Sequence, residues 1–134
     1  MPRVLIASDN YDAALDLEAE LNGAGLDVVA VETTARSTLD AANREHPTVA
    51  LVNSMLRSGS GEPVAGKLLS MGVDVLLTTG NGAQFRGLRK LGNFMCLRRP
   101  FDVHRAVLAL RRLEKQHRRA PSPALRTRAQ RAAE

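Results

Sequence analysis

The segment that decides the fold is VALVNSML, residues 49–56, in which four apolar residues run directly into the polar Asn53. A short, unbroken apolar run of this kind is typical of a central strand in a parallel sheet, because both faces of such a strand are buried. A similar run, Arg3–Ala7, ends in three polar residues at positions 8–10. The two runs predict buried strands whose polar ends lie at the carboxyl edge of one sheet.

Strands and helices are predicted to alternate along the rest of the chain. Short apolar runs predict three more strands, at Leu26–Val31, Val73–Leu77 and Phe94–Leu97. Five helices are predicted, at about 10–23, 34–45, 63–71, 83–91 and from Asp102 onward. Asn10 is expected to cap the first of them and Asp102 the last. The stretch Arg57–Gly61 is rich in Ser and Gly and is predicted to be a loop. This alternation favours an α/β domain with a single five-stranded parallel sheet and helices on both of its faces.

The composition of the chain limits the class of protein. The chain has 134 residues, of which 44% are hydrophobic and 25% charged, as expected for one globular domain. No apolar stretch approaches the roughly 18–20 residues of a membrane-spanning helix, and the N-terminal apolar run is too short for a signal peptide, so a cytoplasmic protein is expected. A single cysteine, Cys96, excludes an internal disulfide and a multi-cysteine metal site. Because Cys96 lies at the end of a predicted strand, we expect it to be buried.

Positive charge is concentrated at the C-terminus. Residues 111–134 contain eight Arg or Lys and two acids, so this segment carries a charge of +6, whereas residues 1–110 carry −1. Two interpretations stay open: a solvated helix end with a soluble tail, or a binding site for an acidic partner such as nucleic acid, a membrane surface or an acidic protein. Aromatic residues make up only 3% of the chain, so any nucleic-acid binding is expected to be non-specific.

The polar residues that follow the predicted strands form the candidate site. In open α/β sheets, ligands bind at the carboxyl ends of the strands, near the point where the strand order reverses. The residues at those ends are Ser8, Asp9 and Asn10 after the first strand, Asn53 and Ser54 after the third, Thr79 after the fourth and Arg99 after the fifth. No P-loop, dinucleotide fingerprint, zinc spacing or nucleophile elbow occurs, so the sequence predicts no catalytic residue.

Four local motifs at these positions resemble the bacterial response-regulator receiver family. They are VLIASDN (4–10), VALVNSML (49–56), VLLTTGNG (75–82) and LRRPFD (97–102), and the 44-residue step from Asp9 to Asn53 also matches the family's spacing. The resemblance covers residues 1–118 and implies a flavodoxin-like fold with the strand order 2-1-3-4-5. Residues 119–134 then form a basic, Arg-rich tail, which is either a helical extension or disordered.

The resemblance also implies a phosphorylation pocket, from which this chain departs. In the family, two acids after the first strand and an Asp after the third hold Mg²⁺; that Asp takes phosphoryl from a histidine kinase, and a Thr and a Lys contact the phosphoryl oxygens. Here Ser8 replaces the first acid, Asn53 the phosphoacceptor and Arg99 the Lys, while Asp9 and Thr79 match. Because Mg²⁺ prefers anionic oxygen ligands, we expect it to bind weakly or not at all, at most through Asp9.

A lone carboxylate in such a pocket commonly pairs with a nearby cation. We therefore predict an internal Asp9–Arg99 ion pair, with the Arg99 guanidinium in the space that a metal ion would otherwise take. Arg99 keeps the positive charge of the family's Lys, but its planar shape makes the exchange non-conservative at a tight site.

These departures predict a pseudo-receiver, a non-enzymatic single-domain signalling protein that acts by protein contact with a histidine kinase or a downstream regulator. Two alternatives stay open: an atypical receiver still switched by phosphorylation or ligand, and a nucleic-acid-associated regulator that acts through the basic tail. The resemblance assigns the partner or homodimer face to the fourth helix, fifth strand and fifth helix. The candidate residues on that face are Arg86, Arg89, Lys90, Cys96, Arg98 and Arg105.

Overall fold

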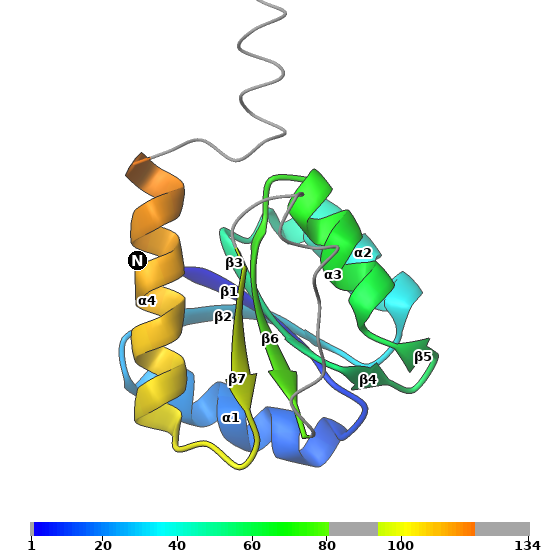
Figure 1. The fold of residues 1–134 in the computed structure, drawn as a ribbon, viewed down its shortest axis with the longest axis horizontal. Helices are drawn as coiled ribbons and strands as arrows, with labels where there is room; N and C mark the ends of the chain where they lie inside the picture. The colour runs from blue at the N-terminus through cyan, green and yellow to red at the C-terminus, as the bar shows by residue number, and fades with distance from the viewer. Residues whose placement is uncertain (1, 81–93, 120–134) are drawn as a thin grey trace, which may run out of the picture.

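The centre of the computed structural model, which describes residues 2–80 and 94–119, is a five-stranded parallel sheet (Figure 1). Its strands are β1 (Arg3–Ala7), β2 (Asp27–Glu32), β3 (Val49–Asn53), β6 (Asp74–Thr79) and β7 (Phe94–Arg98). They lie in the order β2-β1-β3-β6-β7, and every pair of neighbours is parallel. Within this sheet, that order is the predicted 2-1-3-4-5.

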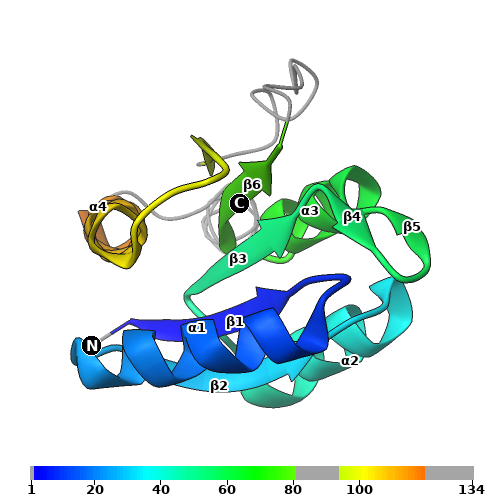
Figure 2. The same cartoon turned by 90° about the horizontal axis from the view of Figure 1, so that it is seen from below.

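Helices cover both faces of the sheet, as predicted. They are α1 (Tyr11–Gly23), α2 (Ala35–Glu45), α3 (Glu62–Ser70) and α4 (Val103–Arg119). Buried side chains of α1 and α4 pack with Ile6 on one face, whereas those of α2 and α3 pack with Leu5 on the other. Figure 2 shows α1 running alongside β1 and β2, and α4 packs on β6 and β7. The predicted helix at 83–91 and the tail from residue 120 lie outside the described residues.

Capping side chains lie at the starts of α1, α2 and α4. The Asn10 side-chain oxygen accepts a hydrogen bond from the Ala13 backbone N–H at 3.0 Å, and the Asp102 carboxylate accepts one from the Arg105 N–H at 3.0 Å. Thr34 forms a reciprocal capping box with Ser37. Each bond satisfies a backbone donor that the first turn of a helix leaves unpaired. The caps confirm the helix starts predicted from the sequence and set them at the carboxyl edge of the sheet.

A short hairpin occupies the stretch that the sequence predicts as a loop. β4 (Met55–Leu56) pairs with β5 (Gly59–Ser60) in an antiparallel arrangement. Gly59 has a φ of +127°, a backbone conformation that other residues rarely adopt. The Arg57 backbone N–H donates to the Thr33 carbonyl at 2.8 Å, and the Ser58 hydroxyl accepts from the Ala35 N–H at 2.9 Å. The hairpin therefore fastens the end of β3 to the start of α2. Strands of two residues are too short to produce a hydrophobic pattern.

Two sequence predictions near the sheet edge need correction. β6 continues through Thr79 rather than ending at Leu77, because residues 78 and 79 stay buried and paired with their neighbours in the sheet. Cys96 is exposed, so the prediction that it is buried is wrong. Cys96 lies on β7, the last strand of the sheet, where only Leu97 is buried. None of the described helices has the length and apolar character needed to cross a bilayer.

Gly61 lies directly under the end of β3. Its backbone N–H donates to the Ser54 carbonyl at 2.8 Å, which closes the loop at the start of α3. A Cβ atom at this position would overlap the backbone carbonyl oxygen of Asn53. The absence of a side chain is therefore required here by the close approach of two backbone segments.

We predict that Gly61→Ala lowers the free energy of unfolding by about 1–3 kcal/mol, because either Asn53 or the start of α3 must move. Urea denaturation followed by far-UV circular dichroism measures the change. Gly23→Ala is the matched control, since no atom lies within 4 Å of its added Cβ and alanine favours a helix. Equal stabilities of the Gly61→Ala variant and the wild type would show that the two segments are not in close contact.

Candidate functional site

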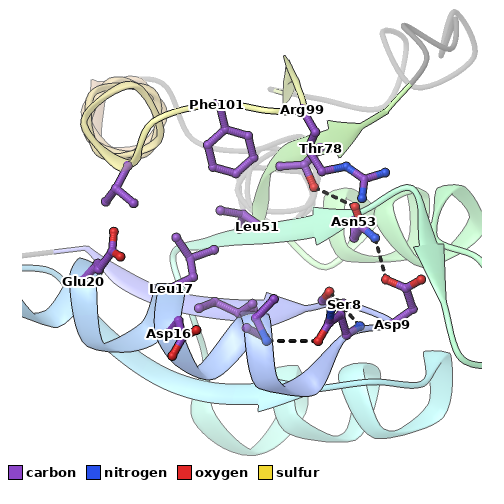
Figure 3. Close-up of a pocket in the computed structure, with 15 residues that line it drawn as sticks. Ser8, Asp9, Asp16, Leu17, Glu20, Leu51, Asn53, Thr78, Arg99 and Phe101 are labelled. Atoms are coloured by element: carbon purple, nitrogen blue, oxygen red, sulfur yellow. Dashed lines mark hydrogen bonds between the residues drawn. The ribbon is translucent and has the colours of Figure 1, made fainter.

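A cavity of about 370 Å³ opens at the carboxyl edge of the sheet, between α1 and the segment that follows β7 (Figure 3). Its apolar lining includes Leu17 on α1, Leu51 on β3 and Phe101 after β7. The polar residues at one end of the cavity include Ser8, Asp9, Asn53, Thr78 and Arg99. α1 adds two further carboxylates to the lining, those of Asp16 and Glu20. Four of the five predicted pocket residues, Ser8, Asp9, Asn53 and Arg99, therefore lie together around this cavity.

The Asn53 side chain is held by three hydrogen bonds. Its amide nitrogen donates to the Asp9 carboxylate at 2.9 Å and to the Met55 backbone carbonyl at 3.1 Å. Its amide oxygen accepts from the Thr78 hydroxyl at 3.0 Å. Asn53 is only 4% exposed, so these bonds replace water rather than compete with it. Both N–H donors are used and the orientation of the amide is fixed, because a flipped amide would set its oxygen against two other oxygens.

Asp9 takes its partner from β3 and not from Arg99. Its carboxylate accepts the Asn53 amide bond, and its backbone carbonyl accepts a longer bond of 3.4 Å from Arg57 Nε. In the part of the chain that the structure describes, no ion pair joins Asp9 to Arg99, so the predicted internal pair is absent. The reason is that a short side chain on the neighbouring strand already reaches Asp9, which is exposed on its other side.

Arg99 lines the cavity from the opposite side. Its backbone N–H donates to the Thr79 carbonyl at 2.8 Å and continues the β6–β7 pairing. Its guanidinium lies over Gly80, where an added Cβ would be 3.2 Å from Nη2. Figure 3 shows the side chain directed toward Asn53. Arg99 therefore sets a positive charge beside the cavity while its side chain remains exposed to solvent.

Ser8 has a local structural role. Its hydroxyl accepts a hydrogen bond from the Asn10 backbone N–H at 3.2 Å, and its own N–H donates to the Glu32 carbonyl at 3.0 Å. The hydroxyl thereby shapes the turn between β1 and the cap of α1. A serine in this position supplies the bond that the turn needs but no negative charge.

The threonine against Asn53 is Thr78 and not Thr79. β3 and β6 are paired with Asn53 opposite Thr78, and paired residues of parallel neighbours project to the same face of the sheet. Thr79 is buried but is not among the residues that line the cavity. The sequence motif aligned Thr79 with the pocket, and only the strand register reveals that its neighbour makes the contact.

Three residues of α1 line the cavity without being indicated by the sequence. Asp16, Leu17 and Glu20 line the cavity beyond the polar end. They have no distinguishing motif, since acidic and apolar residues at this spacing occur on any amphipathic surface helix. Their contribution follows only from how α1 lies against the segment after β7.

The donor set does not fit Mg²⁺. The Asp9 carboxylate and the Met55 carbonyl both accept hydrogen bonds from the Asn53 amide nitrogen, so both oxygens already have an N–H donor. Mg²⁺ sites in proteins use one or two carboxylates in near-octahedral geometry. Asp9 is the only carboxylate at the polar end, and among the described residues no three His, Cys, Asp or Glu side chains come together.

The predicted partner face is described in part. Cys96 and Arg98 on β7 and Arg105 on α4 are exposed, whereas Arg86, Arg89 and Lys90 lie outside the described residues. A shallow groove of about 270 Å³ runs between β7 and α4. Its walls include Met95, Cys96, Arg105, Leu108 and Arg112.

Comparison with known proteins identifies the fold. No family model and no curated protein matches the sequence. Among solved structures, the receiver domain of a Francisella response regulator superposes with a TM-score of 0.74 at 19% identity, over 87% of this chain and 98% of that one. The receiver domain of a modulated diguanylate cyclase from Desulfovibrio desulfuricans superposes with a TM-score of 0.72 at 25% identity, over 87% of this chain and 98% of that one. The anti-anti-sigma factor PhyR from Bartonella quintana superposes with a TM-score of 0.73 at 19% identity, over 89% of this chain and 50% of that one. The chain therefore has the fold of receiver domains.

We predict that Thr78→Val lowers the free energy of unfolding by about 1–3 kcal/mol, because it leaves the buried Asn53 amide oxygen without a donor while preserving side-chain shape. Thermal or urea denaturation measures the loss. Thr78→Ser keeps the hydroxyl and should recover most of it. If valine and serine were equally tolerated, the hydrogen bond to Asn53 would have no energetic importance.

Proposed function

We propose that this chain is a receiver-type module of two-component or phosphorelay signalling that acts by protein contact and takes up no phosphoryl group at Asn53. It is not an enzyme under this proposal, and its partner is a histidine kinase or a downstream regulator. The observation that carries the proposal is the bonding of the Asn53 amide to Asp9, Met55 and Thr78 at the centre of the receiver-like pocket.

The chemistry of an amide argues against phosphoryl transfer at this position. A carboxylate attacks phosphorus with a negatively charged oxygen, whereas an amide oxygen is neutral and its lone pairs are weakened by resonance. In this site, the amide oxygen also accepts the Thr78 hydroxyl, and the amide nitrogen approaches the oxygens that would otherwise hold a cation. These contacts support a pocket that is closed to both metal and phosphoryl group.

Mg²⁺ is accordingly proposed to bind weakly or not at all. Phosphoryl-transfer sites depend on a metal ion to neutralise the developing charge on the phosphoryl oxygens. Here Asp9, the carboxylate at the polar end of the described cavity, accepts a hydrogen bond from an N–H donor, and the Ser8 hydroxyl accepts a bond in the turn before α1. Binding Mg²⁺ would require both the Asn53 amide and the β4–β5 hairpin carbonyl to rearrange.

Conversion of Asn53 to Asp would restore the usual residue, but the local backbone opposes it. Deamidation begins when the following backbone nitrogen attacks the side-chain amide carbon. The Ser54 nitrogen donates to the Thr78 carbonyl at 2.7 Å, and the Asn53 side chain is fixed by its own three bonds. The attack would therefore have to break the β3–β6 pairing first, which supports a stable asparagine.

Action by protein contact fits the rest of the surface. The PhyR structure is named as an anti-anti-sigma factor, and a protein of that description works by binding another protein. The exposed residues at β7 and α4 supply a candidate face for such a contact. Under this proposal, the domain rests in one state of its phosphorylation pocket, and partner binding rather than phosphate sets its activity.

Exposure to acetyl phosphate with Mg²⁺, followed by intact mass spectrometry, tests the proposal. We predict that the wild type gains no phosphoryl group, whereas Asn53→Asp gains one, since it pairs a second carboxylate with Asp9 and frees the Met55 carbonyl. Asn22→Asp makes the same change at the end of α1, away from the cavity, and should stay unlabelled.

Labelling of the wild type at any residue would overturn the proposal. Fragmentation would then locate the modified residue. A lack of labelling in both the wild type and Asn53→Asp would show that Asn53 alone does not account for the absence of phosphorylation.

A further inference from the structure

Two neighbouring helices on one face of the sheet carry opposite charges. α1 has four acids and no Lys or Arg, and α4 has six Lys or Arg and a single acid, Glu114, which is buried. The two helices pack into the same part of the core, on the face opposite α2 and α3. Figure 1 shows them on the side of the sheet away from α2 and α3.

The acidic charges of α1 and the basic charges of α4 do not pair with each other in the part of the chain that the structure describes. No carboxylate of α1 forms an ion pair with α4 there. On α1, Asp12, Asp16 and Glu20 are exposed. On α4, Arg105, Arg112 and Lys115 are exposed, while Arg111 donates to the Ala24 carbonyl at 2.7 Å.

Each of the two helices also carries exposed apolar side chains. Tyr11 and Leu15, one helical turn apart on α1, are 43% and 37% exposed. Leu108 on α4 is 54% exposed and lies between Arg105 and Arg112. Apolar anchors ringed by charged residues are typical of protein interfaces, in which the anchors provide affinity and the charges select the partner.

We propose that the partner of this face is a second copy of the chain, in a two-fold dimer that sets α1 of each protomer against α4 of the other. A two-fold axis sets acidic α1 of one protomer against basic α4 of the other, and symmetry repeats this contact. The acidic and the basic residues are then both paired in a single interface. A partner that is only acidic would cover α4 and leave α1 unmatched. This dimer shares α4 with the face implied by the receiver resemblance and differs from it by including α1.

Sedimentation velocity of the full chain tests the dimer, with two charge-reversed variants. One carries Asp12→Lys and Asp16→Lys on α1, and the other carries Arg112→Glu and Lys115→Glu on α4. We expect each variant alone to weaken self-association by about tenfold or more, because like charges then meet in both halves of the interface. An equimolar mixture of the two variants should recover the dimer, since every α1–α4 contact in the mixed dimer again joins opposite charges.

Two further measurements define the interface. Raising NaCl from about 0.1 M to about 0.5 M should weaken the wild-type dimer at least about threefold, because the charges are exposed to solvent. Arg98→Glu on β7 reverses one exposed charge outside the proposed interface and should leave self-association unchanged. Far-UV circular dichroism of every variant verifies folding.

Three results would overturn the proposal. They are a wild type that stays monomeric at low salt, a dimer broken by Arg98→Glu but not by either helix variant, and variants that fail to associate when mixed although both are folded. Loss of DNA binding in the α4 variant, combined with a monomeric wild type, would assign the basic face to nucleic acid instead.

Discussion

The pocket of this protein is organised around the bonds of one amide nitrogen. Asn53 Nδ2 donates to the Asp9 carboxylate and to the Met55 carbonyl, and so joins the loops that follow β1 and β3. A neutral side chain therefore joins these two oxygens, and the Thr78 hydroxyl donates to the other end of the amide. The orientation of Asn53, the position of the hairpin and the separation of Arg99 from Asp9 all follow from this arrangement.

The same cavity is bordered by a helix that carries only acidic charges. Asp16 and Glu20 of α1 face the segment that leads into the basic helix α4, yet no ion pair closes the space between them in the described residues. Under the proposed function, the surface around this pocket is available for protein contact. The charge division between α1 and α4 is therefore a property of the surface, whereas the Asn53 contacts are a property of the sheet edge.

The fold could be predicted because short local patterns in the sequence mark each strand and most helix starts. Apolar runs such as Val49–Val52 mark buried strands, and caps such as Asn10 and Asp102 mark helix starts. Within the candidate site, only the residues that directly follow a predicted strand could be predicted. Which threonine meets Asn53 depends on the register between β3 and β6, which no single strand encodes. The Asp9–Arg99 pair was expected from charge, but a hydrogen bond from the adjacent strand takes precedence because Asn53 is close and already ordered.

The most direct test of a pocket closed by Asn53 is an NMR titration of the wild-type protein with MgCl2, followed through the side-chain amide resonances of Asn53. We predict that both N–H signals of this amide exchange slowly with solvent and do not move at millimolar Mg²⁺, because both protons are hydrogen-bonded and no cation enters. Fast exchange of these protons with solvent in the absence of metal would contradict the hydrogen bonds, and signals that shift and saturate with Mg²⁺ together with the backbone of Asp9 would contradict the closed pocket. Such a shift would mean that the pocket still binds a metal ion.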